Sequence, residues 1–202
     1  MLNEFELLVD ALSSLPSIGK KSARKLAFFL LDQDQKYIHE FTNRIINAKK
    51  NIKKCIACNN ISLNLLCSIC SNSNRDNSTL CVVPTIEDLD KIETSGSYDG
   101  LYFVINGELT CKKSNMSLVE VNIHELTNRI KDDSKIENLI IATNFSYSGE
   151  YTSKYIQNNL SDLKLNIFRI GFGLPLNSSL DYADNETLKQ AFINKKILKK
   201  GS

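Results

Sequence analysis

The first third of the chain has its apolar side chains at steps of three and four residues, the spacing of an amphipathic helix. Pro16 and Gly19 interrupt this stripe over residues 1–31, so we expect a helix, a short turn and a second helix. Residues 37–50 repeat the pattern and predict a third helix. The stretch 55–70 shows neither helical nor strand periodicity, so its order must come from something other than an apolar face.

The remainder of the chain alternates short apolar runs with helical stretches. The runs rich in branched and aromatic residues predict β-strands, at 80–83, 101–105, 139–143 and 165–170. Each run is apolar on both faces, which is typical of a parallel sheet covered by helices on both sides. The sequence therefore predicts an α/β unit after the helical one.

Polar residues mark where the helices of this second unit are expected to begin. Thr85 and Asn122 each precede an apolar stripe and have an acidic residue three positions later, the spacing of a capping box. Asp184 is expected to cap a last helix that runs through Ile193, and a further helix is expected over 151–160.

The chain has 202 residues, enough for one or two compact domains. Its net charge of +2 does not by itself indicate a nucleic-acid partner, but a local basic face matters more than the total. The basic residues crowd the first quarter of the chain, at Lys20, Lys21, Arg24, Lys25, Arg44, Lys49, Lys50, Lys53 and Lys54. No secretion signal or membrane-length apolar window is found, so we expect a cytoplasmic protein without a membrane partner.

Cysteine usage points to a metal rather than to disulfides, which a reducing compartment disfavours. Two C-x-x-C pairs are separated by eight residues, and their members are Cys55, Cys58, Cys67 and Cys70. Four thiolates can surround one Zn²⁺ tetrahedrally and leave no open position for water, so one structural zinc per chain is predicted. The alternatives are two unrelated thiol pairs or a redox pair. Cys81 is expected to be a small core residue, and neither it nor Cys111 is expected to be a ligand.

Residues 15–27 resemble a helix–hairpin–helix, in which backbone amides at the start of the second helix receive a DNA phosphate. Gly19 is expected to permit the unusual backbone of the turn. Lys21 and Lys25 lie one helical turn apart and are placed to follow the phosphate backbone without reading sequence. The motif commonly has Gly where Ser17 stands. The alternative is an ordinary turn between packed helices, with the lysines on a solvated face.

The hairpin, the four-cysteine site and the α/β unit, taken in this order, resemble the bacterial recombination mediator family RecR. Later stretches agree with motifs of that family, at Ile141–Asn144 with Gly149 and Glu150, at Arg169–Pro175, and at Leu180–Asp184 with Thr187 and Leu188. The similarity covers nearly the whole chain. It is specific because of the order of the motifs, not because of any one of them.

The resemblance implies an α+β multidomain protein. The expected parts are a helix–hairpin–helix DNA-binding region over 1–53, a four-cysteine zinc finger over 54–78, a Toprim α/β domain with a parallel sheet over 79–175, and a C-terminal helical segment over 176–202.

The resemblance also implies a DNA-binding mediator of recombinational DNA repair. Members of the family assemble into dimers and tetrameric rings that can encircle DNA. They act with RecO, and in many bacteria with RecF, to load RecA on gapped or single-stranded DNA. The expected partners are therefore a second copy of the chain, RecO and RecF, and double-stranded and gapped DNA bound without sequence specificity.

No catalysis is expected, because the acids that Toprim enzymes use to hold Mg²⁺ are depleted. Pro84 follows the first strand where a Glu is required, and Ser148 stands where relatives carry Glu. Glu150 remains, but a lone carboxylate is a poor Mg²⁺ site. The resemblance implies that acids of this domain help to bind a partner protein, and Glu150 is expected to do so. The alternative is a Mg²⁺-dependent Toprim nuclease in which Glu87, Asp88 and Glu150 converge. A third reading is a zinc-ribbon interaction module with no role on DNA.

Overall fold

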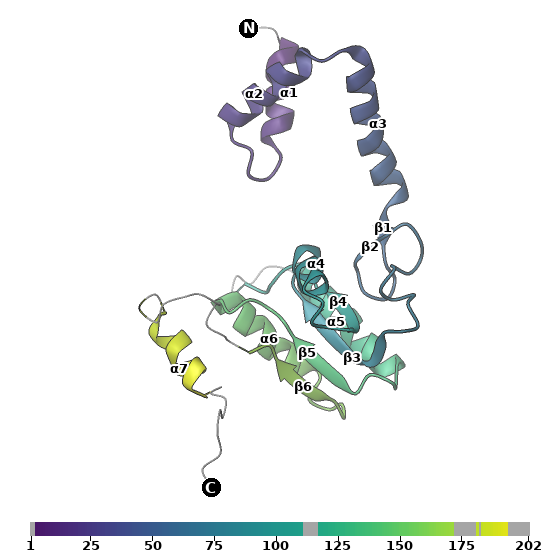
Figure 1. Ribbon diagram of the computed structural model, residues 1–202, viewed down its shortest axis with the longest axis vertical. Helices are drawn as coiled ribbons and strands as arrows, with labels where there is room; N and C mark the ends of the chain where they lie inside the picture. The colour runs from purple at the N-terminus through teal and green to yellow at the C-terminus, as the bar shows by residue number, and fades with distance from the viewer. Residues whose placement is uncertain (1–2, 111–116, 172–180, 182, 194–202) are drawn as a thin grey trace. The chain divides into compact units, whose positions relative to one another are not determined.

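The computed structural model (Figure 1) describes residues 3–110, 117–171, 181 and 183–193. Cys111 and the motif residues 172–175, 180 and 182 lie outside the described residues. The chain divides into two compact units, Met1–Lys53 and Lys54–Ser202, and each is described by itself.

The first unit consists of three helices, which confirms the expectation from apolar spacing. They are α1 (Asn3–Ser13), α2 (Lys20–Leu31) and α3 (Gln35–Asn51). Helices α1 and α2 pack through a small core in which Val9, Ala23 and Ala27 are buried. Ile18, in the turn between them, packs against this core. Small residues on α2 let the two helices approach closely.

The second unit begins with a small two-stranded sheet of β1 (Lys53–Lys54) and β2 (Ile61–Ser62), which sequence periodicity did not indicate. A four-stranded sheet follows, in the order β4-β3-β5-β6, and all its pairings are parallel. Its strands are β3 (Asp76–Val83), β4 (Gly100–Val104), β5 (Asn138–Ile141) and β6 (Asn166–Arg169). The parallel sheet predicted from the four apolar runs is therefore confirmed.

Helices cover both faces of this sheet (Figure 1). Helices α5 (Leu118–Asp132) and α6 (Tyr147–Asn159) pack on one face, and α4 (Ile86–Thr94) packs on the other. A further helix, α7 (Asn185–Ile193), lies near the C-terminus. Together with the cysteine cluster described below, this confirms the predicted α+β architecture.

The helix caps confirm two of the three predicted starts. Thr85 accepts a hydrogen bond from the Asp88 amide, and Asp184 accepts one from the Thr187 amide. The third prediction was wrong, because α5 begins one turn earlier with a complete capping box at Ser117. Two competing polar patterns, at Ser117 and at Asn122, lie five residues apart here, and local spacing did not distinguish them.

Asn122 lies inside α5 rather than at its start, and only 4% of it is exposed. Its side-chain amide donates to the Ile105 carbonyl at 2.8 Å, at the carboxyl end of β4. Helix α6 also starts earlier than expected, at Tyr147, because Ser146 caps it through the Gly149 amide. Within the described part of the chain, no helix is both long enough and apolar enough to cross a bilayer.

Candidate metal centre and nucleic-acid interface

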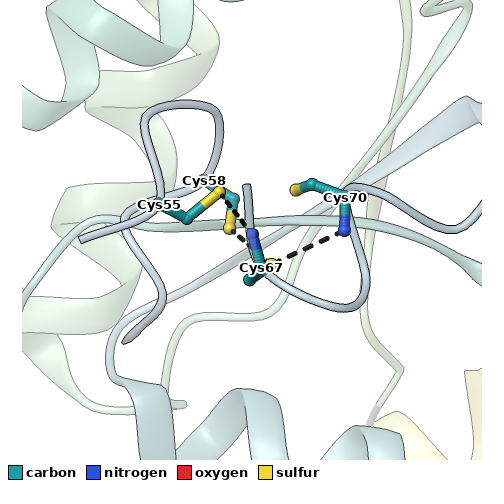
Figure 2. A group of neighbouring side chains, drawn as sticks. All are labelled: Cys55, Cys58, Cys67 and Cys70. Carbon is teal, nitrogen blue, oxygen red and sulfur yellow. Dashed lines mark hydrogen bonds between the residues drawn. The ribbon is translucent and has the colours of Figure 1, made fainter. Parts of the chain in front are cut away.

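The four cysteines of the two C-x-x-C pairs come together in one cluster (Figure 2). Their Sγ atoms all lie within 4.8 Å of one another, and those of Cys58 and Cys67 are 3.6 Å apart. Sulfurs placed about 2.3 Å from a tetrahedral zinc ion stand about 3.8 Å from each other. The four sulfurs are therefore close enough together to bind a single ion after small side-chain movements.

Backbone hydrogen bonds shape the two loops that carry these cysteines. The Cys55 amide donates to the Asn60 carbonyl at 2.7 Å, and Asn59 takes a left-handed φ of 63° that Asn tolerates well. Two amides also donate to sulfurs: Cys67 N to Cys55 Sγ at 3.3 Å, and Cys70 N to Cys67 Sγ at 3.5 Å. Such donors favour the thiolate form that a metal requires.

Burial and charge distinguish the thiols from one another. Cys55 and Cys58 are almost fully buried, whereas Cys70 is partly exposed. The Cys58 thiol hydrogen-bonds to the Cys70 sulfur, which lowers the pKa of Cys70 to about 6, and the Arg129 guanidinium acts in the same direction. That shared hydrogen bond raises the pKa of Cys58 well above its ordinary value.

The cysteine loop also covers the free edge of strand β4, the outer strand of the sheet. The Val104 amide donates to the Cys58 carbonyl at 2.8 Å, and the Asn59 side chain donates to the Val104 carbonyl at 3.3 Å. All five residues of β4 are buried although the strand is at the edge. The loop thus satisfies backbone groups that an open sheet edge would leave exposed.

The hairpin between α1 and α2 has its strained backbone at a residue other than the one expected. Gly19 is in an ordinary extended conformation (φ −78°, ψ 162°), so the expectation that it permits the unusual backbone was wrong. Ser17 takes the left-handed φ of 65°. The Ile18 amide donates to the Leu15 carbonyl at 3.2 Å, so Leu15–Ile18 forms a turn with Pro16 second and a positive φ third. That is a type II turn, in which the third position favours Gly.

Gly19 has a different use, as the residue at the N-cap of α2. No side chain caps this helix end, and a Cβ on Gly19 would meet nothing within 4 Å. The first amides of α2 therefore have no side-chain cap, and the space beside the Gly19 Cα is open. Lys21 and Lys25 are exposed on α2, whereas Arg24 pairs with Glu6 at 2.9 Å and lies over the Phe5 ring.

The carboxyl edge of the parallel sheet is held by Arg169, a residue to which the sequence assigned no role of its own. Its guanidinium donates to the Ile141 and Asn144 carbonyls at 2.9 and 3.0 Å, and to the Glu150 carboxylate at 3.0 Å. The Phe145 ring centroid lies 4.5 Å from the same group. Glu150 is thus half-exposed and paired with Arg169.

Glu108 supplies a second carboxylate at this edge, and no local sequence pattern indicates it. Its oxygens accept from the Asn144 amide at 2.7 Å and from the Ser148 hydroxyl at 2.8 Å, and Ser146 donates to it at 3.2 Å. Glu108 follows the turn after β4, so 40 residues of chain separate it from Ser148. Only the parallel topology brings the two together.

The carboxylates that a Mg²⁺ enzyme needs do not gather in the described residues. Asp88 accepts from the Thr85 hydroxyl as part of the α4 cap, and Pro84 is buried at the end of β3. Within 3–110, 117–171, 181 and 183–193, the cysteine cluster is the single group of three or more His, Cys, Asp or Glu side chains close enough to share an ion.

A two-helix hairpin followed by a four-cysteine centre built onto a parallel sheet defines a Toprim protein with its own helix–hairpin–helix. Comparison with family models gives matches to three segments of the chain, on either side of the cysteine loops. The matches are the RecR helix-hairpin-helix over residues 5–49, the Toprim domain over 78–171 and the RecR C-terminal model over 173–196.

Individual relatives give the same result. The recombination protein RecR of Ureaplasma urealyticum is 50% identical over 197 residues, which is 97% of each chain. That of Lactobacillus acidophilus is 38% identical over 184 residues, 91% of this chain and 92% of the relative. That of Francisella tularensis subsp. novicida is 37% identical over 186 residues, 92% of this chain and 91% of the relative. The chain belongs to the RecR family of recombination proteins.

Proposed function

We propose that this protein is a DNA-binding recombination mediator in DNA repair that closes around DNA as a homodimer or a tetrameric ring. In this role it acts in the cytoplasm with RecO, and with RecF where present, to load RecA on gapped or single-stranded DNA. The observation that carries the proposal is the uncapped N-terminus of α2 beside the exposed Lys21 and Lys25, in a chain of the RecR family.

The DNA contact follows from the chemistry of that helix end. Free amides and the positive end of the helix dipole attract a phosphate, and Gly19 leaves the approach open. Lys21 and Lys25 are four residues apart, so they lie on one face of α2 and can each meet a phosphate of the same strand. Such contacts are to the backbone, which fits binding that does not depend on sequence.

The proposed metal is zinc, one ion per chain, held by the four cysteines. A closed set of four thiolates suits Zn²⁺ and leaves no position for a reacting water, so the ion has a structural role. Replacing one ligand tests this. We expect Cys58→Ser to lose most of the bound zinc and to lower the unfolding temperature, measured by elemental analysis and calorimetry. Full zinc content with unchanged stability would contradict the assignment.

Self-association is supported by apolar residues that the first unit leaves exposed. Helix α3 contains no buried residue within this unit. Its Tyr37, Phe41 and Ile45 follow one another at four-residue steps and are each more than two-fifths exposed. An exposed apolar stripe of this kind is typical of a helix that packs against another chain. We propose that a second copy of this chain covers this apolar stripe of α3.

We further propose that the Toprim unit binds a partner protein and does not cleave DNA. The absence of a third carboxylate near Glu108 and Glu150, among the residues described, supports this because Mg²⁺ needs several oxygen ligands. Glu150 is half-exposed and belongs to the carboxyl edge, where ligands of parallel sheets bind. A cleavage assay with Mg²⁺ or Mn²⁺ tests this, and metal-dependent cleavage lost in Glu150→Ala would overturn it.

The decisive test of the main proposal is the salt dependence of DNA affinity. Fluorescence anisotropy with a gapped duplex gives the slope of log K against log salt concentration, which is about 0.9 per phosphate contact. We expect Lys21→Ala with Lys25→Ala to reduce that slope by about 1.8 for each chain whose hairpin meets the duplex. An unchanged slope would show that Lys21 and Lys25 do not contact DNA phosphates.

One control and one further variant accompany the double variant. Lys91→Ala with Lys131→Ala makes the same change in charge on exposed positions of the second unit and should leave the slope unchanged. Gly19→Ala meets no steric obstacle in the fold, so its unfolding temperature should match the parent. Its methyl group nevertheless stands in the open space before the α2 amides, so its DNA affinity should fall.

A further inference from the structure

Strand β4 is at the edge of the sheet, yet its outward carbonyls, those of Gly100, Tyr102 and Val104, accept hydrogen bonds from side chains elsewhere in the chain. Leu101, Phe103 and Ile105 are directed to β3, as the Ile105 amide shows by donating to the Val83 carbonyl. The alternate residues face outward. Arg75 donates to the Gly100 carbonyl at 3.1 Å, and Arg129 donates to the Tyr102 carbonyl at 2.9 Å. Each arginine comes from a different segment.

Arg129 differs from Arg75 because it also reaches the cysteine loop. The same Nη1 that contacts Tyr102 donates to the Ala57 carbonyl at 2.6 Å. Ala57 lies between Cys55 and Cys58, so the contact is made within the first C-x-x-C turn. The centroid of the Phe103 ring lies 6.0 Å from Cζ of Arg129, so the ring lies beside the guanidinium.

Helix α5 holds the other side of the same turn. Glu125, one helical turn before Arg129, accepts from the Asn59 side chain at 3.3 Å. That amide group also donates to the Val104 carbonyl at 3.3 Å. Residues 57–59 are therefore held between α5 and the edge strand, with Arg129 at one end and Glu125 at the other. Of these two, Arg129 carries the positive charge, which offsets the net −2 of four thiolates around a divalent ion.

We infer that Arg129 is the positioning residue that holds the first C-x-x-C turn against strand β4 and thereby couples metal binding to the stability of the Toprim sheet. The inference rests on the metal site proposed above. Residues that orient metal ligands without binding the metal change its affinity by about 10- to 100-fold when replaced. A planar guanidinium is suited to this task because one group can meet two carbonyls in fixed directions.

The test measures zinc release from the full-length, zinc-loaded protein into an excess of a chromogenic chelator, at a temperature well below unfolding. We expect Arg129→Met to release zinc about 10- to 100-fold faster than the parent. Arg129→Lys keeps the charge but not the planar donors, so its rate should lie between the two. Arg75→Met is the matched control, because it also removes an arginine that donates to a carbonyl of the edge strand. It leaves the contacts of residues 57–59 unchanged. Its release rate should equal that of the parent.

Thermal unfolding with and without bound zinc gives the second readout. In the parent, removal of zinc should lower the unfolding temperature of the second unit, and in Arg129→Met this decrease should be smaller because the link is gone. Arg129→Met releasing zinc at the rate of the parent, or no faster than Arg75→Met, would overturn the inference. Should Arg129→Met fail to fold, Arg129→Lys decides by the same criterion. A parent that binds no zinc, cobalt or cadmium would overturn the metal site as well, which separates the two failures.

Discussion

The turn that precedes helix α2 contains a strained residue, and the cost of that strain can be measured. Ser17 has a φ of 65°, a conformation that costs an L-amino acid roughly 1–2 kcal/mol relative to the right-handed region. Its side chain is exposed, so replacing it with Gly removes no buried packing. We therefore expect Ser17→Gly to stabilise the first unit.

The expected gain is smaller than the full strain. Gly has more conformational freedom in the unfolded chain, and this lowers the free energy of unfolding by roughly 0.4–1 kcal/mol. The net stabilisation should be about 0.5–1 kcal/mol. For a unit of this size, 1 kcal/mol corresponds to roughly 4–8 °C, so the unfolding temperature of the first unit should rise by about 2–8 °C.

Native-state hydrogen exchange of the α2 amides, together with calorimetry, measures this change without assuming that the two units unfold together. Ser22→Gly is the matched control, because Ser22 is an exposed residue within α2 and the change of atoms is the same. There Gly should cost about 0.5 kcal/mol through its poorer helix propensity. The two substitutions thus have opposite predicted signs, and a loss of stability in Ser17→Gly would refute the assignment of strain to this turn.

Three further predictions concern the second unit. Asn122→Ala should destabilise it by about 1–3 kcal/mol in urea unfolding, because the buried Ile105 carbonyl loses its donor; the exposed Asn128→Ala should change little. Glu108→Ala should speed hydrogen exchange of the Asn144 amide, whereas equal protection in variant and parent would show that Glu108 does not hold that loop. Burial raises the pKa of Cys81 to about 12, so its thiolate fraction at pH 8 is about 10⁻⁴ and alkylation there should require unfolding; rapid alkylation in the folded protein would contradict this.

Features fixed by neighbouring residues could be predicted from the sequence. The strand runs, the Thr85 cap and the grouping of the four cysteines all follow from spacings of two to eight residues. Asn122 shows how such reasoning fails. It carries a capping pattern as good as that of Ser117, and the difference lies in the Ile105 carbonyl, 17 residues away in the chain.

The residues that organise the two sites could not be predicted, because their partners are distant in sequence. Arg129 lies 72 residues from Ala57, and Glu108 lies 36 residues from Asn144. Nothing near either residue in the chain indicates these contacts. They depend on which strand forms the edge of the sheet and on which loops meet at its carboxyl end, and both are properties of the folded topology.

The departures from the family pattern have different physical consequences, which argues against treating them alike. Ser17 keeps the turn that Gly would form and bears the strain locally, so the hairpin is retained at some cost in stability. Ser148 removes a carboxylate, but its hydroxyl donates to Glu108, so a negative charge remains at that edge although it comes from another segment. Pro84 is buried and offers no ligand at all. The carboxyl edge thus keeps an ordered network of hydrogen bonds around Glu108 and Glu150, while the convergence of ligands that Mg²⁺ chemistry needs is missing from the residues described.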